Sequence, residues 1–181
     1  MGETAAITID RLSKEDLEQV LAIERASFSM PWSRNLFLAE FRNPDVSLML
    51  AARSPAAGGR VIGYIVCWIV ADELHILDLA TEFPCRRQGI ARRLVLAAVK
   101  AGNDRRVQRA FLEVRESNRA ALMLYEGLGF VRSLVREGYY DLPVENAVVM
   151  SLDHDGIVNA SLKTERNERS DAGDSSRITI G

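Results

Sequence analysis

The sequence predicts one α+β (mixed α/β) domain with a mixed central sheet of six to seven strands and about four flanking helices. Three observations lead to this prediction. Three apolar segments separated by turns, between residues 47 and 81, are typical of a meander of strands. The apolar spacing then becomes that of a helix over residues 89–101. A strand, a short helix and two closing strands follow, and the pattern ends at Leu152.

The segment before the meander is expected to hold one strand and two helices. A short strand is predicted at residues 7–9, and Ser13 with Asp16 resembles a capping box at the start of a helix. Ser33 is a suitable N-cap for a second, shorter helix. The remaining strands are expected at residues 47–53, 61–70, 74–81, 110–114, 130–140 and 147–152, and the remaining helices at 89–101 and 119–126.

Composition excludes several classes of protein. The 181 residues fit one domain, 48% of them are hydrophobic, and the net charge of −2 lacks the positive excess of a nucleic-acid binder. The longest apolar stretch, residues 61–71, is too short to cross a membrane, and residues 1–10 lack the features of a secretory signal. Cys67 and Cys85 have neither zinc nor redox-motif spacing, so we expect a reduced, cytoplasmic protein with no metal site.

The last part of the chain has a different composition. From Asp153 onward bulky apolar residues are few, and Glu, Arg, Asp and Ser are frequent. Such a segment buries too little apolar surface to fold by itself. The sequence therefore predicts a domain over residues 1–152 and a disordered tail over residues 153–181.

The turn Arg86–Ala91, "RRQGIA", is the most informative local signal. It lies between a predicted strand and a predicted helix, where unpaired N–H groups and the helix dipole favour an anion such as a pyrophosphate. Gly89 allows close approach, and four arginines at positions 86, 87, 92 and 93 add positive charge. Neither a P-loop nor a G-x-G-x-x-G motif is present. Taken alone, the turn also fits an ordinary strand–turn–helix with a basic first turn.

The order of elements, "R-x-x-G-x-A" and the downstream "LEVRESNRAALMLYEGLGF" together resemble the GNAT superfamily, over about Ile7 to Leu152. "FSMPWS" and "REGYYDLPVENAVVMSL" resemble the RimI-like enzymes, the ribosomal-protein-alanine N-acetyltransferases, within it. Asp78 and Thr81 depart from the "N-x-A-V" usual in these enzymes, and Ala91 replaces a glycine. The resemblance implies acetyl-CoA as co-substrate. It also implies a protein N-terminus as acceptor, above all the N-terminal alanine of a ribosomal protein, with neither nucleic acid nor a membrane as partner.

The resemblance also implies a set of coenzyme-binding residues. Backbone amides of the turn would hold the pyrophosphate, and the preceding strand end would pair with the pantetheine arm through its N–H and C=O groups. An asparagine at the start of the next helix would contact the coenzyme, and it is also a plausible N-cap. The residues implied are Leu79, Ala80, Thr81, Arg86, Arg87, Gln88, Gly89, Ile90, Ala91, Arg92 and Asn118.

Two side chains are implied to do the chemistry. Strand alternation alone would turn Glu113 to solvent, but the resemblance makes it the general base that takes the proton of the acceptor amine. Tyr125 would be the general acid that protonates the departing thiolate, because a phenol with a pKa of about 10 is protonated at neutral pH. The amine would attack the thioester directly. An acyl-cysteine route through Cys67 or Cys85 lacks an evident neighbouring base.

The acceptor is less well specified. Trp32, Tyr139 and Tyr140 are the candidate acceptor-binding residues, and each also fits ordinary packing, since aromatic residues favour strands and loops near a core. Lysine side chains and small amines are alternative acceptors. A non-catalytic acyl-CoA-binding module is a third hypothesis, which would require neither Glu113 nor Tyr125.

Overall fold

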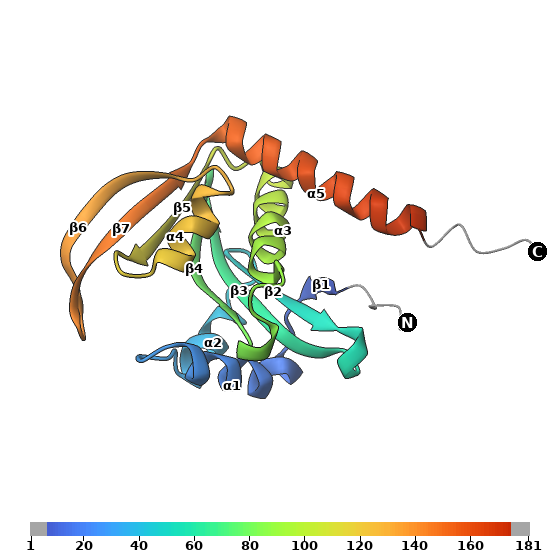
Figure 1. Ribbon diagram of the computed structural model, residues 1–181, viewed down its shortest axis with the longest axis horizontal. Helices are drawn as coiled ribbons and strands as arrows, with labels where there is room; N and C mark the ends of the chain where they lie inside the picture. The colour runs from blue at the N-terminus through green and yellow to red at the C-terminus, as the bar shows by residue number, and fades with distance from the viewer. Residues whose placement is uncertain (1–6, 175–181) are drawn as a thin grey trace, which may run out of the picture.

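The computed structural model describes residues 7–174, apart from the side chains of residues 165 and 167–174. Its centre is one seven-stranded sheet with the order β1-β2-β3-β4-β5-β7-β6 (Figure 1). Every neighbouring pair is antiparallel except β4 and β5, so the predicted mixed sheet is confirmed. The strands are β1 (Thr8–Arg11), β2 (Ser47–Ser54), β3 (Arg60–Val70), β4 (Glu73–Thr81), β5 (Arg109–Arg115), β6 (Val131–Asp141) and β7 (Val144–Leu152).

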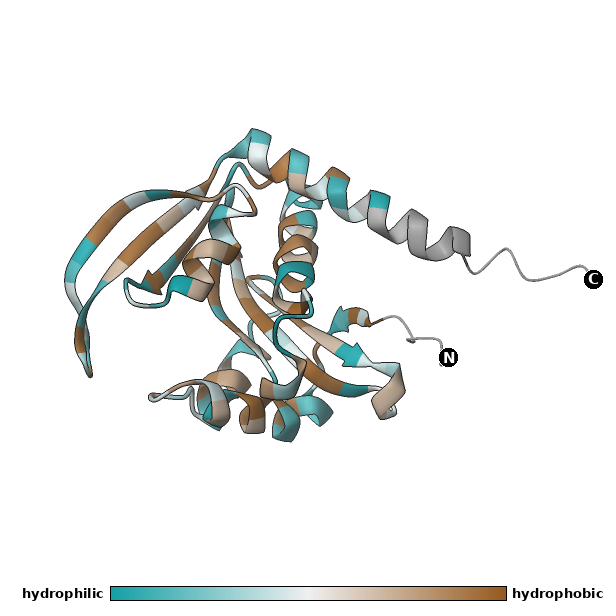
Figure 2. Ribbon diagram, in the orientation of Figure 1, coloured by the Kyte–Doolittle hydropathy of each residue, from teal (hydrophilic) through white to brown (hydrophobic). Residues whose placement is uncertain are grey.

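Helices cover both faces of the sheet, as the two hydrophobic clusters show. One cluster joins α1 and α2 to one face of β2 and β3. The other cluster joins α3, α4 and α5 to the opposite face of the sheet. Hydrophobic residues follow the central strands and α3 in Figure 2, which agrees with this arrangement. The helices are α1 (Leu17–Ser27), α2 (Arg34–Glu40), α3 (Ile90–Asp104), α4 (Arg119–Glu126) and α5 (His154–Asp174). No helix in the described residues is long and apolar enough to span a bilayer.

The start of α1 is fixed by a buried ion pair. The Asp16 carboxylate accepts the Ser13 backbone N–H at 2.9 Å, which is half of the predicted capping box. Both Arg53 terminal nitrogens donate to Asp16, at 2.8 and 2.7 Å, and tie α1 to β2. These hydrogen bonds from Arg53 are the main reason that the pKa of Asp16 falls to about 2.

We expect Asp16→Asn to lower the free energy of unfolding by about 2–4 kcal/mol at pH 7, because it leaves a largely buried guanidinium without its full partner. The Asp16 pKa is depressed in the folded state, so its stabilisation is present above the unfolded pKa near 4 and is lost as the pH falls toward 2. Urea unfolding at pH 7 and pH 3 measures both effects. The difference between wild type and variant should shrink at pH 3, whereas Asp10→Asn, at a more exposed partner of Arg53, should cost less at pH 7. Equal costs for the two variants would contradict this role.

The sheet opens between β4 and β5. Their parallel pairing runs only from Glu73–Arg109 to Ile76–Leu112, although both strands continue beyond it. The β3–β4 register also shifts here, so that Leu77 is an extra residue on β4. Beyond this bulge, Asp78 and Ala80 face the α1 side of the sheet, because Ala80 belongs to the cluster under α1. The edge of β4 from residue 77 to 81 therefore lacks a strand partner on the β5 side.

The predicted disordered tail does not hold for residues 154–174, which form α5 packed on α3. Ile157 and Ala160 are buried in the α3 cluster, and Ser161 and Thr164 continue the same stripe. Their spacing is helical, but three of the four side chains are small, which is why composition alone suggested a tail. The domain as described thus extends beyond the predicted boundary at 152. Residues 175–181 of that tail lie outside the described residues.

Candidate active site

The turn before α3 has the geometry of an anion site. Arg87 and Gly89 both have positive φ, 63° and 77°, which is unusual for the non-glycine residue. Alternating conformations of this kind turn successive N–H groups toward one side. The first backbone bond of the helix runs from Arg93 N–H to Gly89 C=O at 3.0 Å. Within the described chain, the N–H groups of residues 87–92 donate to no other group, so they are available to an anion.

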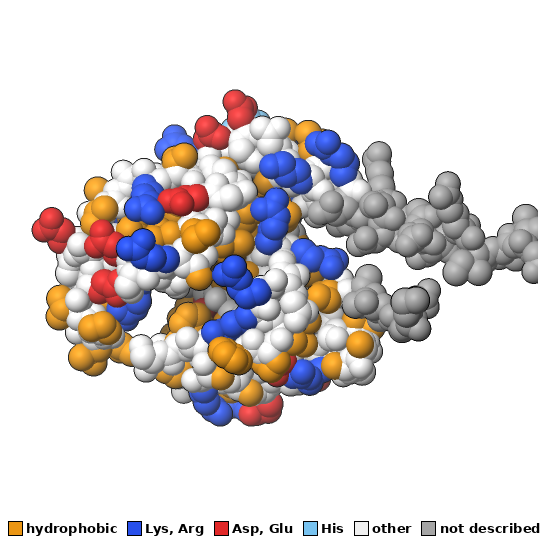
Figure 3. Space-filling model, viewed as in Figure 1, with side chains coloured by type: hydrophobic (Ala, Val, Ile, Leu, Met, Phe, Trp, Pro, Cys, Tyr) orange, Lys and Arg blue, Asp and Glu red, His pale blue; other side chains and the backbone are white. Residues whose placement is uncertain are grey.

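The basic side chains of this turn are mostly used to hold it in place. The Arg86 guanidinium donates to the Thr81 carbonyl and to the Ser27 hydroxyl, each at 3.1 Å, and so joins the turn to β4 and α1. Arg92 donates to the Gly127 carbonyl at the end of α4, at 3.3 Å. Gln88 donates to the Pro84 carbonyl at 3.3 Å. Lys and Arg side chains gather over α3 and α4 on the face shown in Figure 3, which favours a polyanionic ligand there.

The predicted coenzyme residues lie beside open space and unpaired polar groups. A Cβ added to Gly89 would meet no atom within 4 Å, so the space over the free N–H groups is open. Leu79, Ala80 and Thr81 pair with β3 on one edge and leave the other edge unpaired. The buried Thr81 hydroxyl has no hydrogen-bond partner among the described residues. A ligand that offers amides along this edge would satisfy its unpaired backbone groups.

The two elements predicted to bind the coenzyme, the turn before α3 and the end of β4, are packed closely because of a second glycine. A Cβ at Gly63 on β3 would lie 3.1 Å from the Ala80 carbonyl oxygen and 3.2 Å from Ile90 Cγ2. This close contact seats the N-terminus of α3, with Ile90 buried, directly against the end of β4. The turn and the open strand edge therefore form one surface.

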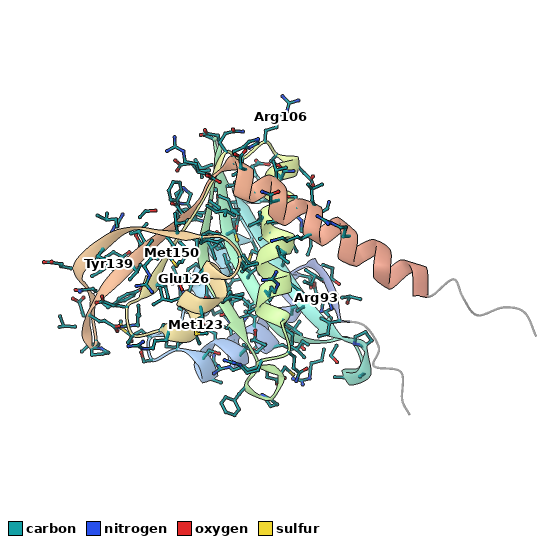
Figure 4. All side chains as sticks on the ribbon, turned by 45° about the horizontal axis from the view of Figure 1, so that its top comes forward. Arg93, Arg106, Met123, Glu126, Tyr139 and Met150 are labelled. Carbon is teal, nitrogen blue, oxygen red and sulfur yellow. The ribbon has the colours of Figure 1, made fainter. Side chains whose placement is uncertain are left out.

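Helix α4 supplies the predicted asparagine and tyrosine. Asn118 is the N-cap, and its Oδ1 accepts the Ala121 N–H at 3.1 Å, so its predicted capping role is confirmed. Tyr125 is buried and packs edge-on to Phe130 at 5.6 Å between ring centroids. Burial raises the pKa of Tyr125, so its phenol is protonated at neutral pH. Met123 and Glu126 instead lie on the exposed side of α4 (Figure 4).

Glu113 lies on β5 just beyond the last β4–β5 pair. Its side chain is neither buried nor fully exposed, at 29% exposure. Arg136 on β6 forms an ion pair with it at 2.9 Å, and the Tyr139 hydroxyl hydrogen-bonds to it, which raises the pKa of Tyr139. The structure thus brings Glu113 and Tyr139 together, from strands on either side of β7. Figure 4 shows Tyr139 on the β6–β7 hairpin, away from Arg93 on α3.

The side chains of the other two candidate acceptor-binding residues contact neighbouring side chains of the protein. Tyr140 stacks beneath the Arg115 guanidinium at 4.0 Å and lies edge-on to Tyr139 at 5.1 Å. The Trp32 ring packs against Phe37 at 5.4 Å, in the loop between α1 and α2. These contacts order the side chains around Glu113 and beside α1, but they leave the acceptor roles as predictions.

The cysteines have the wrong environment for a nucleophile. Cys67 is fully buried, and burial raises the pKa of its thiol. Burial and the nearby Glu82 carboxylate also raise the pKa of Cys85. Raised pKa values reduce the thiolate that nucleophilic attack needs. In the described residues, no three His, Cys, Asp or Glu side chains gather as a metal site would require.

One feature was missed from the sequence. It lies beside the opening between β4 and β5, which we call the splay. The Tyr64 hydroxyl contacts two buried carboxyl groups, Glu24 from α1 and Asp78 from β4, the latter at 2.9 Å. Burial, followed by the charge of Glu24, raises the pKa of Asp78 to about 7. The available signal was a carboxylate within the apolar stripe of the first helix, but its partners are 40 and 54 residues away in the sequence.

Comparisons with known proteins decide the family. The model of the Acetyltransferase (GNAT) family matches residues 17–130. The chain belongs to the GNAT acetyltransferase family. It is 32% identical over 151 residues to a putative [ribosomal protein bS18]-alanine N-acetyltransferase of Bacillus subtilis, which covers 83% of this chain and 96% of that one. This GNAT enzyme is therefore RimI-like, as its motifs predicted.

Solved structures agree with this assignment. The ribosomal-protein-S18-alanine N-acetyltransferase from Escherichia coli superposes with a TM-score of 0.75 at 30% identity, over 82% of this chain and 94% of that one. The NatC complex, solved with Gag peptide and CoA, gives a TM-score of 0.73 at 28% identity, over 81% and 98%. The GNAT chain described here is an acetyl-CoA-dependent N-acetyltransferase.

Proposed function

We propose that this GNAT enzyme acetylates the α-amine of a protein N-terminus, and that its acceptor is the N-terminal alanine of ribosomal protein bS18. The observation that carries the proposal is the similarity of this chain to proteins with that stated activity over nearly their whole length, combined with the open β4–β5 splay. Such an acceptor places the reaction in the cytoplasm. An α-amine suits a simple acid–base site, because its pKa near 8 is well below that of lysine near 10.4.

The proposed chemistry assigns one proton transfer to Glu113 and the other to Tyr125. Acetyl-CoA supplies an activated acetyl thioester. Glu113 takes the proton of the attacking amine, directly or through a water, and Arg136 and Tyr139 hold its carboxylate in place. Tyr125 gives its phenolic proton to the thiolate that leaves. Backbone N–H groups on the unpaired edge of β4 are suited to polarise the thioester carbonyl.

The acceptor is tested by following free thiol release with acetyl-CoA and a matched set of acceptors. The set contains the N-terminal peptide of bS18 beginning with alanine, the same peptide N-terminally blocked but containing lysine, and a polyamine. Release only with the free alanine peptide is expected. Release with the blocked peptide or the polyamine would reject the acceptor assignment but keep the enzyme class. Coenzyme binding without any release would favour the acyl-CoA-binding module.

The base is tested by Glu113→Gln, which keeps shape and removes the proton acceptor. We expect kcat for the alanine peptide to fall about 100-fold at pH 7, the low end for general base catalysis, because the amine is already partly neutral. The loss should shrink above pH 8, where the neutral amine predominates. Steady-state rates from pH 6.5 to 9 measure it. Glu126→Gln, at an exposed carboxylate paired with Arg132, is the control and should stay near wild type. A pH-independent loss would mean that Glu113 is not the base.

A further inference from the structure

The trio of Glu24, Tyr64 and Asp78 connects two parts of the site. Glu24 lies in the last turns of α1 and accepts the backbone N–H of Trp32 at 2.6 Å, which fastens the α1–α2 loop (residues 28–33) to α1. Its other oxygen contacts the Tyr64 hydroxyl on β3. Tyr64 in turn contacts Asp78, the first residue beyond the bulge of β4. One chain of hydrogen bonds therefore runs from the loop to the open strand.

The hydrogen bonds of this trio require a proton on one carboxyl group. A phenol has one O–H and can donate to only one carboxylate. The Tyr64 oxygen nevertheless contacts both Glu24 and Asp78. Both contacts are hydrogen bonds only if one carboxyl is protonated and donates to the phenol oxygen, while the phenol donates to the other. Two ionised carboxylates would leave one contact without a proton and would repel each other in a buried site.

Asp78 is the member that holds this proton. Glu24 accepts the Trp32 N–H through one carboxylate oxygen and contacts the phenol through the other, so both of its oxygens already have partners. Burial and the Glu24 charge raise the pKa of Asp78, opposed in part by Tyr64 and the Leu79 backbone. The titratable groups that face Asp78 are Glu24 from α1, Tyr64 from β3 and Tyr125 from α4. In the described residues neither carboxylate forms an ion pair with Arg, Lys or His.

We propose that Glu24, Tyr64 and Asp78 are positioning residues that hold the α1–α2 loop against β4 for acceptor binding, and that they do so only while Asp78 keeps its proton. Loss of the proton separates the two carboxylates, shifts Glu24 and releases the Trp32 N–H. The loop then loses its fixed distance from the splay, and acceptor binding weakens. This inference deepens the proposed function, because it takes the α1–α2 loop to contact the acceptor.

Asp78→Asn separates this role from general structural support. Asparagine is neutral at every pH and can donate its amide N–H to the Tyr64 oxygen, as the protonated aspartate does. It is also the residue at this place in the "N-x-A-V" pattern. The variant should therefore hold the loop permanently in the binding position. Asp104→Asn, at an exposed carboxylate at the end of α3, is the matched control.

The kinetic test measures the acceptor KM at saturating acetyl-CoA from pH 6 to 8.5. The quantity compared is the KM of wild type divided by the KM of Asp78→Asn. Titration of the peptide amine affects both enzymes equally and cancels in the ratio. We expect the ratio to be near one at pH 6 and to rise about tenfold by pH 8, the effect of one charge-assisted hydrogen bond, with kcat nearly unchanged. Asp104→Asn should follow wild type. A ratio that is flat with pH would overturn the proposal.

A second measurement needs no acceptor. In a Trp68→Phe background, the fluorescence of Trp32 reports on the α1–α2 loop alone. It should titrate with a midpoint near pH 7 in the enzyme with Asp78, and should not titrate over this range in Asp78→Asn. Titration without acetylation of the alanine peptide would reject the proposed acceptor and keep the proton-dependent loop. Acetylation without titration would reject the loop device and keep the acceptor.

Discussion

Tyr125→Phe is expected to lower the single-turnover rate of acetyl transfer by about 1000-fold, within the range for loss of a general acid. Burial raises the pKa of the Tyr125 phenol, so the proton is in place at neutral pH when the thiolate leaves. The substitution retains the ring and its edge-on contact with Phe130, so stability and acetyl-CoA binding should change little. The O–H alone is removed.

The measurement is rapid mixing of enzyme in excess over acetyl-CoA with saturating alanine peptide, which keeps product release out of the observed rate. Binding of acetyl-CoA by calorimetry and the melting temperature are the controls, and both should match wild type closely. A single-turnover rate within threefold of wild type would show that the thiolate leaves without Tyr125. The raised pKa of the phenol would then reflect only its burial.

Much of the fold was predicted from the sequence because its signals are local. The strand segments, the capping residues Ser13 and Ser33 and the helix after Gly89 depend on residues within a few positions of each other. The same holds for the turn of residues 86–91, whose motif was one of the signals that indicated the family. Side-chain type and spacing are sufficient there, since period and capping express the backbone geometry directly.

Other features depend on contacts that spacing does not record. The bulge at Leu77 is a matter of register between β3 and β4, and it decides which face Asp78 meets. The positive φ of Arg87 occurs without a glycine to signal it. Helix α5 could not be recognised from its own sequence, because its buried side chains are mostly small. It is stabilised by packing against α3. Sequence reasoning named Glu113 and Tyr139 separately as candidate site residues. Their contact and the ion pair of Glu113 with Arg136 come from the pairing of β6 with β7.

Gly89→Val is expected to weaken acetyl-CoA binding by at least 100-fold, or about 3 kcal/mol. Valine at φ 77° is strained, and its branched side chain would occupy the open space above the free N–H groups of residues 87–92. A pyrophosphate held by several backbone N–H groups would lose two or more charge-assisted hydrogen bonds, each of which contributes about 1.5–3 kcal/mol.

The glycine at position 58 provides a control with the same backbone strain. Gly58 has φ 69°, no atom within 4 Å of an added Cβ and a place in the turn between β2 and β3. Gly58→Val should lose similar stability but bind acetyl-CoA as wild type does in calorimetry. Acetyl-pantetheine, which lacks the pyrophosphate, should be used equally well by Gly89→Val and Gly58→Val. Gly89→Val could instead lose activity with acetyl-CoA and with acetyl-pantetheine to the same extent. The turn would then support the fold of the splay rather than bind the phosphates, and the anion would have to be bound by the arginine side chains around it.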